Sequence, residues 1–266
     1  MVIGWSGNDM WVVKPPASLF LMMQCEPFIG MSMRVLIIDN MDGTPLGQIG
    51  VALDEANVEI LRVAAYRGQP LPESTDGFDG LIVLGGEQDA LDDVHYPYMP
   101  ALCSLMRDFV SEDKSVLGVC LGSQLLARAH GGDNLLNYTR EFGWQDVSLT
   151  SEGQVDPVLG ALPEHFDIFE WHVDSFTLPA EAVHLARNQA VESQAFRIGR
   201  AAYGMQFHFE ANQSVVESWC DKFEASVERM SPGWLGRFED ERAAHGERAD
   251  AAGLTIAKNW VKTLPR

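Results

Sequence analysis

Apolar runs that alternate with segments of helical spacing are the feature that most constrains the fold of this chain. The runs at 34–40 (RVLIIDN), 80–86 (GLIVLGG) and 115–120 (SVLGVC) are nearly continuous, as buried parallel strands are. Residues 48–62 and 98–113, which lie between the runs, place apolar side chains at helical spacing. Strands that alternate with helices predict an α/β fold, in which helices cover both faces of a mainly parallel, open sheet.

The second half of the chain is predicted to add short strands and then helices. Its β-like pieces, which we expect to be partly antiparallel, are 144–150, 166–172, 183–188, 195–200 and 202–210. After residue 211 an apolar stripe predicts helix, with Val215, Val216, Trp219, Phe223 and Val227 on one side. Residues 249–264 predict a final amphipathic helix. We expect one domain over 34–210, with the helices of 211–266 packed on it.

The acidic, globular composition excludes several classes of partner. The chain has 266 residues, of which 46% are hydrophobic, and a net charge of −19. Such a surface repels the phosphates of nucleic acids and of anionic membranes, so we expect neither as a partner. The apolar stretch at 17–23 is too short to span a bilayer and makes a poor secretory signal. We therefore expect a cytoplasmic protein whose residues 1–33 form a mobile N-terminal extension.

The cysteines argue against a structural metal or a disulfide framework. Cys25, Cys103, Cys120 and Cys220 are widely spaced, and the sequence contains no CxxC pair. A zinc knuckle is therefore not expected, and reduced thiols fit the predicted cytoplasmic setting. No other cluster of metal ligands is apparent in the sequence.

Cys120 lies in a motif that is typical of a nucleophile held on a sharp turn. It is the centre of G-x-C-x-G, between Gly118 and Gly122, directly after a predicted strand and before a short predicted helix. Small neighbours permit a strained turn, and the N-terminus of the next helix stabilises a thiolate or an oxyanion. The motif alone is equally consistent with a buried structural cysteine in a βα turn.

A thiol nucleophile needs a base, and His208 with Glu210 is the best candidate in the sequence. The two residues lie two positions apart at the end of the β-like run 202–210. Alternate side chains of a strand point to the same side, so we expect Glu210 to orient the His208 imidazole toward the thiol. A cysteine elbow together with this pair favours catalysis over a structural role.

The order and spacing of these motifs resemble those of the class I, triad-type glutamine amidotransferase domain. The resemblance covers about residues 34–210 and is carried by GVCLGSQLLA (118–127), LGGEQD (84–89) and GMQFHFE (204–210). Further segments are similar to stand-alone members related to the amidotransferase domain of GMP synthase: REFGW (140–144), WHVDSF (171–176) and QAF (194–196). The resemblance implies a flavodoxin-like α/β sheet with added antiparallel strands and C-terminal helices.

The resemblance also implies a catalytic role for each motif. Cys120 would attack the amide of glutamine, or of a γ-glutamyl amine or peptide, and form a γ-glutamyl thioester. His208 would carry the proton from the thiol to the leaving amine, while Glu210 orients the imidazole. Backbone N–H groups of Gly86 and Leu121 would form the oxyanion hole. Neither a metal nor an organic cofactor is needed.

The resemblance defines the residues of the substrate pocket less sharply than the catalytic ones. Gln124 matches the family position that contacts the glutamyl part of the substrate, and Gly85 adjoins the oxyanion turn. Trp171 and His172 are candidates for the pocket lining, with a structural role as an equal alternative; Trp219 we interpret as core. Three positions depart from the family pattern and bear on substrate choice: Glu87 and Phe209 replace proline, and Val173 replaces glycine.

Three functions remain open at this stage. The first is hydrolysis of a small γ-glutamyl substrate by the isolated chain, and the second is the role of a glutaminase that supplies ammonia to a separate synthetase partner. The third is a non-catalytic binding member, which the presence of Cys120, His208 and Glu210 disfavours. The residues after 210 contain no recognisable synthetase region, which favours hydrolysis. A homo-oligomer is left open.

Overall fold

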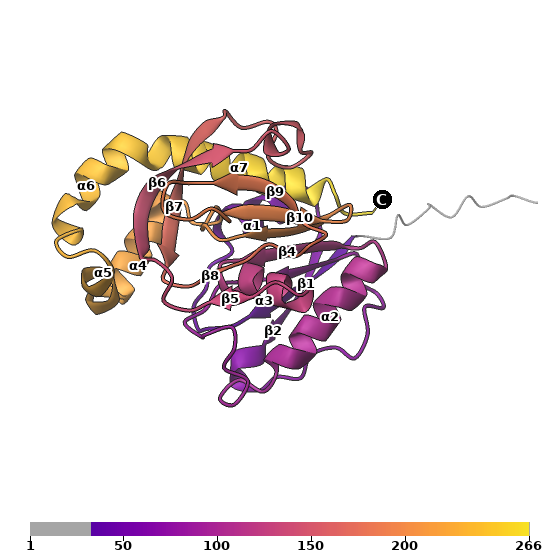
Figure 1. Ribbon diagram of the computed structural model, residues 1–266. Coiled ribbons are helices and arrows are strands. Elements are labelled where there is room, and N and C mark those ends of the chain that lie inside the picture. Colours follow the sequence, from indigo (N-terminus) through magenta and orange to yellow (C-terminus); the bar gives the residue numbers. More distant parts are fainter. Residues whose placement is uncertain (1–32, 266) are drawn as a thin grey trace, which may run out of the picture. The chain divides into compact units, whose positions relative to one another are not determined.

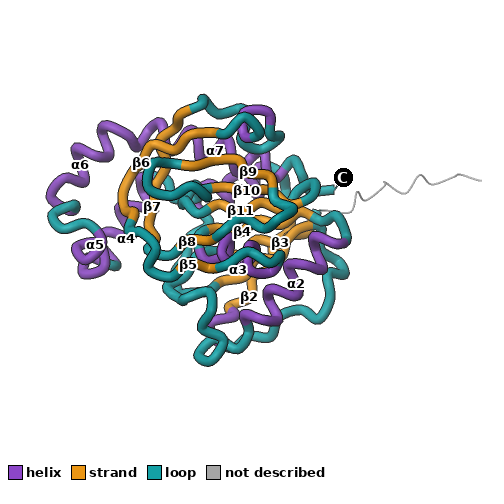
Figure 2. Tube along the Cα trace, viewed as in Figure 1, coloured by secondary structure: helices purple, strands orange, loops and turns teal. Residues whose placement is uncertain are grey.

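The structure, a computed structural model, describes residues 33–265, so the predicted extension at 1–33 lies, apart from Met33, outside the described residues. A nine-stranded mixed sheet forms the centre of this range (Figures 1 and 2). In spatial order its strands are β2 (Glu59–Ala64), β1 (Arg34–Asp39), β3 (Gly80–Val83), β4 (Ser115–Val119), β11 (Ala202–Met205), β10 (Ala195–Ile198), β9 (Val183–Arg187), β6 (Glu141–Leu149) and β7 (His165–His172). A separate pair joins β5 (Asn134–Leu135) to β8 (Ser175–Phe176).

One half of the sheet is parallel and carries the elements that the apolar runs predict. Strand β1 pairs with β2 and β3, and β4 pairs with β3 and β11, all in parallel. The runs at 34–40, 80–86 and 115–120 form β1, β3 and β4, and their side chains are buried because helices lie on both faces. The predicted α/β class is confirmed.

The helices divide between the two faces of the parallel half, as predicted. On one face α1 (Gly47–Glu55) and α7 (Glu247–Val261) share a core with Val35 and Ile37 of β1. On the other face α2 (Met99–Ser111) and α3 (Leu121–Ala129) share a core with Leu36 and Ile38. This alternation follows from the period of two along β1. Figure 1 shows α7 and α2 on opposite sides of the sheet.

The other half of the sheet is antiparallel, which confirms the predicted added strands. Strands β11, β10 and β9 pair antiparallel in turn, as do β9, β6 and β7. Three further helices pack against β6 and β7: α4 (Gln213–Lys222), α5 (Glu224–Met230) and α6 (Phe238–Glu241). Their shared core is aromatic and contains Phe142, Trp144, Phe169, Trp219, Trp234 and Phe238.

The predicted helix over 48–62 is wrong in its second half. Helix α1 ends at Glu55, and Asn57 follows in the left-handed region with φ 53°. Asparagine tolerates that conformation, which stops a helix. Residues 59–64 then form β2, an edge strand. Its parallel pairing with β1 outweighs the helical spacing of its apolar residues.

The apolar stripe after residue 211 belongs to two helices, which is a second difference from the expectation. Helix α4 ends at Lys222, and Phe223 has non-helical φ and ψ of −122° and 31° before α5 begins at Glu224. Asn212 caps α4 by accepting the Val215 N–H at 3.0 Å. The break separates α5 from α4 and places Phe223 at the junction. The final predicted helix is confirmed as α7.

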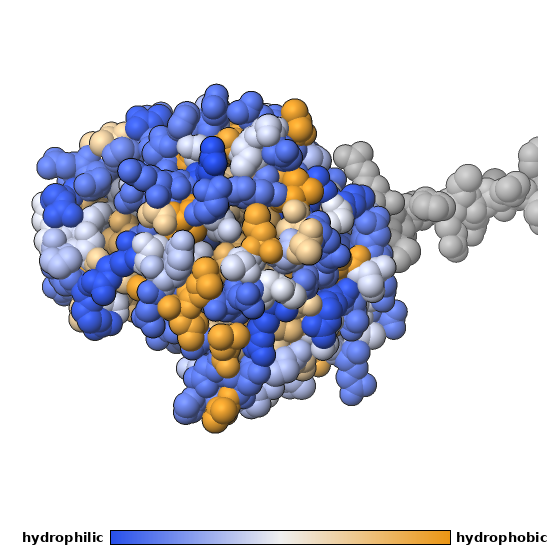
Figure 3. Space-filling model, in the orientation of Figure 1, coloured by the Kyte–Doolittle hydropathy of each residue, from blue (hydrophilic) through white to orange (hydrophobic). Residues whose placement is uncertain are grey.

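The three cysteines among the described residues form no disulfide. Cys103, Cys120 and Cys220 are free and buried, whereas Cys25 lies outside the described residues. No helix within residues 33–265 combines the length and the apolarity that crossing a membrane requires. Hydrophilic side chains predominate on the face that Figure 3 presents, and hydrophobic ones form small patches there.

Candidate active site

Cys120 occupies a strained turn between β4 and α3, as the motif predicts. Its φ and ψ are 51° and −110°, a combination that non-glycine residues rarely adopt. The Cys120 N–H donates to the carbonyl of Met205 at 2.8 Å, which ties the turn to β11. The Cys120 carbonyl accepts the N–H groups of Ser123 and Gln124 at 2.9 and 3.2 Å, which starts α3. The surrounding hydrogen bonds therefore hold the conformation in place.

The two flanking glycines permit this turn because the chain leaves no room for side chains there. A Cβ on Gly118 would lie 2.3 Å from the carbonyl oxygen of Gly122, and a Cβ on Gly122 would lie 2.0 Å from that of Val83. Both distances are far below van der Waals contact. The predicted need for small residues beside Cys120 is confirmed.

Replacing Gly122 by alanine should lower the free energy of unfolding by about 3 kcal/mol, because the new methyl group meets the rigid backbone of Val83. Gly236→Ala is the matched control: its Cβ would meet no atom within 4 Å, and we expect a change within about 0.5 kcal/mol. Urea denaturation of both variants checks this. Equal unfolding free energies for the two variants would contradict the steric interpretation.

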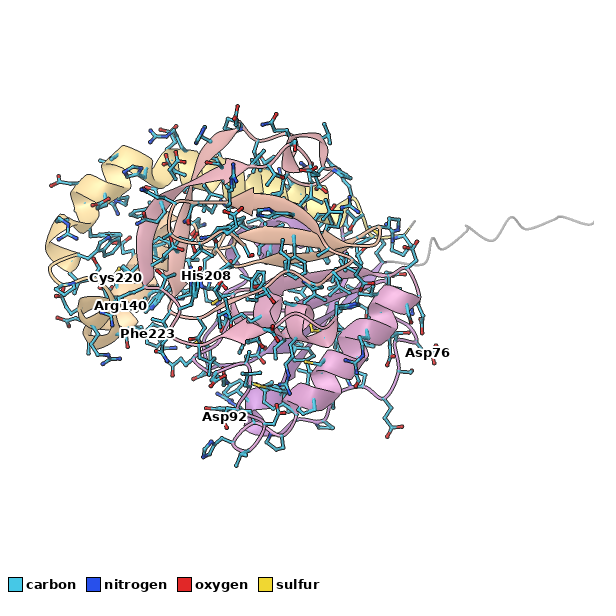
Figure 4. All side chains as sticks on the ribbon, in the orientation of Figure 1. Asp76, Asp92, Arg140, His208, Cys220 and Phe223 are labelled. Atoms are coloured by element: carbon cyan, nitrogen blue, oxygen red, sulfur yellow. The ribbon has the colours of Figure 1, made fainter. Side chains whose placement is uncertain are left out.

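His208 and Glu210 lie together beside this turn, but not for the reason that strand alternation supplies. Strand β11 ends at Met205, and His208 to Glu210 form a turn in which Ala211 N–H donates to the His208 carbonyl at 3.2 Å. The His208 N–H donates to Phe169 of β7 at 2.8 Å. Within the turn, His208 Nδ1 lies 2.7 Å from Glu210 Oε1. Figure 4 labels His208 in its setting.

The side chains of His208 and Cys120 both lie against Gly85. An added Cβ at Gly85 would lie 3.2 Å from His208 Cε1 and 3.4 Å from Cys120 Cβ, so both side chains contact this glycine. Since Nδ1 of His208 faces Glu210, Nε2 is the ring nitrogen left to interact with the thiol. The three predicted side chains, from β4–α3 and from the turn after β11, are therefore gathered at one place.

Electrostatics at this site favour a protonated imidazole. Burial acts to lower the pKa of His208, but the charges of Glu210 and Cys120 outweigh it and raise that pKa well above its usual range. Glu210 is 1% exposed, and its Oε2 has no hydrogen-bond partner among the described residues. The site thus favours an imidazolium beside the Cys120 sulfur, and a histidine so placed can activate a thiol.

Two backbone N–H groups are free to stabilise negative charge near the thiol. Across the described residues, neither Gly86 N–H nor Leu121 N–H donates a hydrogen bond to the protein. Leu121 is the first residue of α3, where the helix dipole is positive. Gly86 must be a glycine, since a Cβ would lie 2.9 Å from that of Asn40. Gly86 and Leu121 are the two residues whose N–H groups the family resemblance predicts as the oxyanion hole.

A cavity of about 480 Å³ opens beside Cys120. This volume is typical of pockets for small organic ligands. Predicted site residues Gly85, Gly86, Trp171 and His208 line it, and Cys120 Sγ lies 3.8 Å from the Trp171 carbonyl. The remaining lining residues are Met41, Gly43, Thr44, Glu87, Arg140, Val173, Trp219, Phe223, Ser226, Arg229 and Met230.

Several residues of this lining were missed from the sequence. Trp219, interpreted as core, is mostly buried yet lines the cavity and packs edge-on against His208 with ring centroids 5.2 Å apart. Phe223, Arg229 and Met230 come from the α4–α5 segment, and Arg140 immediately precedes β6. The REFGW segment contains Arg140, but nothing in the sequence indicates that α5 lies next to it.

Two predicted pocket residues lie behind the wall of the cavity. Gln124 is buried, and its amide donates to Gln206 Oε1 at 3.2 Å and to the Asp174 carbonyl at 3.4 Å. Val173 lines the cavity, but the neighbouring His172 side chain, which is 1% exposed, does not. Gln124 and His172 thus both bond to the backbone of Asp174, next to Trp171 and Val173, which line the cavity. Direct contact of Gln124 or His172 with a substrate stays a prediction.

His172 lies in a buried ionic cluster that the sequence did not reveal. Its Nε2 lies 3.0 Å from Glu141 Oε2 and 3.3 Å from Glu170 Oε2, and its Nδ1–H donates to the Asp174 carbonyl at 2.8 Å. Asn188 and Gln194 donate to Glu141 at 2.6 and 2.9 Å. The ligand atoms of Glu141, Glu170 and His172 are close enough together to hold a metal ion. The same contacts also suit an imidazolium, whose two N–H groups point at the Asp174 carbonyl and at the two carboxylates.

The pKa values of His172 and Glu170 are both raised in this cluster. Burial acts to lower the pKa of His172, but its hydrogen bonds with Glu141 and Glu170 raise it to about 10. Burial raises the pKa of Glu170 to about 7. Both groups therefore bind protons more tightly in the folded protein than in the unfolded chain.

Comparison with known proteins places this geometry in context. The chain is 31% identical to the glutamine amidotransferase-like protein YfeJ of Salmonella typhimurium over 155 residues, which cover 57% of this chain and 65% of the relative. It is 34% identical to a glutamine-hydrolysing GMP synthase subunit of Methanococcoides burtonii over 134 residues, 50% of this chain and 64% of the relative. It is 26% identical to gamma-glutamyl peptidase 5 of Arabidopsis thaliana, over 73% of this chain and 77% of the relative. The chain thus spans less than two thirds of the first two.

Solved structures of similar fold cover most of the chain. A glutamine amidotransferase from Thermotoga maritima matches with a TM-score of 0.77 at 24% identity, over 88% of this chain and 99% of that one. A glutamine amidotransferase from Methylobacillus flagellatus matches with a TM-score of 0.75 at 27% identity, over 89% and 96%. The family model described as glutamine amidotransferase class-I matches residues 38–220, from β1 into α4. The chain therefore belongs to the class I glutamine amidotransferase family.

Proposed function

We propose that the protein is a cysteine-dependent hydrolase that cleaves the γ-glutamyl amide bond of a small substrate and releases glutamate. The observation that carries the proposal is that Cys120 and His208 both contact Gly85, with Glu210 Oε1 2.7 Å from His208 Nδ1. Membership of the amidotransferase family and the similarity to a gamma-glutamyl peptidase support this reaction class. No metal or organic cofactor enters the proposed reaction.

The proposed reaction has two steps. The Cys120 thiolate attacks the γ-carbonyl carbon, and the N–H groups of Gly86 and Leu121 stabilise the oxyanion, each well-placed donor contributing roughly 3 kcal/mol. The C–N bond then breaks, the amine takes the proton held by His208, and a γ-glutamyl thioester remains. In the second step, water gives a proton to His208 and its oxygen to the carbonyl carbon, which releases glutamate and the thiolate.

A substrate panel and a covalent label test this proposal together. Purified protein is given glutamine, γ-glutamylamines and γ-glutamyl peptides while glutamate release is measured. In parallel, 6-diazo-5-oxonorleucine, an electrophilic analogue of glutamine, is added and the modified residue is located by peptide mass spectrometry. Glutamate release together with a label on Cys120 supports the proposal. A protein that neither turns over nor becomes labelled is a binding member of the fold, and the proposal fails.

The second candidate function is that of a glutaminase working with a synthetase, favoured by the 34% identity to a GMP synthase subunit. In this case the isolated chain would be labelled on Cys120 but silent toward the whole panel. Turnover of glutamine would start only when a synthetase that consumes ammonia is added. Turnover of any substrate by the isolated chain contradicts this second candidate.

The carboxylate of Glu210 should be required for the first step. We expect Glu210→Gln to lower kcat by roughly 10²- to 10⁴-fold, because an amide neither stabilises the imidazolium nor selects its tautomer. The matched control is Glu181→Gln, which removes the carboxylate 2.7 Å from Nδ1 of His130, outside the cavity lining. Steady-state glutamate release checks both variants. Comparable kcat values for the two variants would show that Glu210 has no such role.

A further inference from the structure

The cavity has an outer arm that glutamine leaves unfilled. We define the outer arm by Arg140, Phe223, Ser226, Arg229 and Met230, which come from the segment before β6 and from the α4–α5 segment. Figure 4 shows Arg140 and Phe223 on the α4–α5 side of His208. The departing part of glutamine is only ammonia, which is too small to fill this arm.

Aromatic contacts lead from the proposed reaction centre to the outer arm. The His208 ring packs on Trp219, Trp219 on Trp171, and Trp171 on Phe223, with centroid distances of 5.2, 5.7 and 5.9 Å. All four rings line the cavity. Met230 of α5 adds a further apolar side chain. This stretch of the wall favours an apolar group on the departing side of the amide.

The outer arm carries two arginines without a carboxylate partner. Arg140 Nη1 donates to the Arg229 carbonyl at 3.0 Å, and Arg229 Nη2 donates to Ser226 Oγ at 2.7 Å. Within residues 33–265, no carboxylate oxygen lies within 4.0 Å of either guanidinium, whereas ten other arginines have one. Among the described residues that line the cavity, Glu87 carries the one carboxylate.

The lack of a carboxylate partner for Arg140 and Arg229 is unexpected in so acidic a protein. With a net charge of −19, the chain has ample carboxylates to neutralise its arginines, yet leaves these two unpaired in the cavity wall. Both side chains line the same cavity, and Arg140 contacts the backbone of Arg229, so an anion in the outer arm is attracted by both positive charges. Arginine suits a carboxylate because its N–H groups form two parallel hydrogen bonds with the two oxygens.

We propose that Arg140 and Arg229 bind a carboxylate on the departing amine, so that the preferred substrates are γ-glutamyl peptides with an apolar side chain. This inference rests on the proposed function. The scissile amide lies at Cys120, the apolar side chain of the departing amino acid lies along Trp171 and Phe223, and its carboxylate meets the two arginines. Glutamine and neutral γ-glutamylamines make only part of these contacts.

A matched pair of substrates tests the inference. γ-Glutamyl-phenylalanine and γ-glutamyl-phenethylamide differ only in the carboxylate of the departing part. We expect kcat/KM of the native protein to be about tenfold higher for the peptide, which is the ratio that roughly 1.4 kcal/mol supplies. The ratio should fall in 0.5 M NaCl, since the arginines are exposed to solvent and salt screens their charge.

Variants assign this ratio to the arginines. Arg229→Gln is the first choice, because it leaves the Arg140 hydrogen bond to the Arg229 backbone in place. We expect it to bring the ratio of the two kcat/KM values close to one, and Arg229→Lys to keep part of the preference. The control is Arg107→Gln, another arginine without a carboxylate partner, which bonds to the Ala129 carbonyl and lies outside the cavity lining. The control should keep the native ratio.

The outcomes separate this inference from the proposed function. If neither substrate is hydrolysed, the proposed function itself fails. If both are hydrolysed at equal kcat/KM by the native protein, the hydrolase stands and the assignment of the outer arm is wrong. If Arg229→Gln slows both substrates by the same factor, the arginine binds the carboxylate of the glutamyl part, which also overturns the inference.

Discussion

Cys120→Ala should lower kcat for every γ-glutamyl substrate by roughly 10⁴-fold or more, because Cys120 carries the one thiol among the described residues that line the cavity. Folding should be little affected. The Cys120 sulfur is a small group that lies 3.8 Å from the Trp171 carbonyl oxygen, and alanine keeps the backbone and most of the packing. We expect the free energy of unfolding to change by about 1 kcal/mol or less. Glutamate release and urea denaturation measure the two effects.

Cys103→Ala is the control for this variant. Cys103 is also free and buried, but it lies on α2 and bonds to the Leu125 carbonyl at 3.6 Å, outside the cavity lining. Its replacement should leave kcat near the native value. If Cys120→Ala kept more than a few per cent of native kcat while Cys103→Ala reduced it, the assignment of the nucleophile would be wrong.

The second large effect concerns stability. His172→Gln removes the cation between Glu141 and Glu170, which are 5% and 0% exposed and cannot find water instead. Removing one partner of a buried ion pair costs about 3–5 kcal/mol, and we expect a loss of this order at pH 7. His165→Gln is the control, since His165 forms the same kind of pair with Asp146 at 3.0 Å but is 62% exposed. It should cost less than about 1 kcal/mol.

The same cluster predicts how stability depends on pH. The pKa of His172 is raised from 6.5 to about 10, so its contribution is fully present below pH 6.5 and is lost as the pH rises toward 10. The pKa of Glu170 is raised from 4.5 to about 7, and its contribution changes in the same direction at lower pH. The native protein should therefore lose unfolding free energy between pH 7 and pH 10 more steeply than His172→Gln. Parallel curves from urea denaturation would contradict the ion-pair interpretation.

Much of the fold could be predicted because local sequence and tertiary environment agree there. The buried strands β1, β3 and β4 are nearly continuous apolar runs, and α2, α3 and α7 have regular apolar faces. Where the two disagree, prediction failed. Residues 59–62 have helical spacing but pair with β1, and the break at Phe223 interrupts an unbroken apolar stripe. Both outcomes depend on neighbours that are distant in sequence.

The candidate site follows the same division. Cys120 was predictable because its turn needs glycines at fixed positions next to it, and this need is local. The pairing of His208 with Glu210 was also predicted, although by a strand geometry that the chain does not adopt. Trp219, by contrast, is both packed in a core and part of the cavity wall, and its sequence pattern reports only the packing.

The α/β class, the cysteine elbow and the candidates His208 and Glu210 could be found from the order of the residues, because short-range sterics and apolar periodicity act along the chain. The surroundings of the thiol depend on the folded chain instead. Arg140 and Arg229 are 89 positions apart and Glu141 and His172 are 31 apart, and they meet because strand pairing and helix packing bring these segments together. Charges that act through space leave no mark on local sequence pattern, so the full lining of the cavity is visible only in the folded chain.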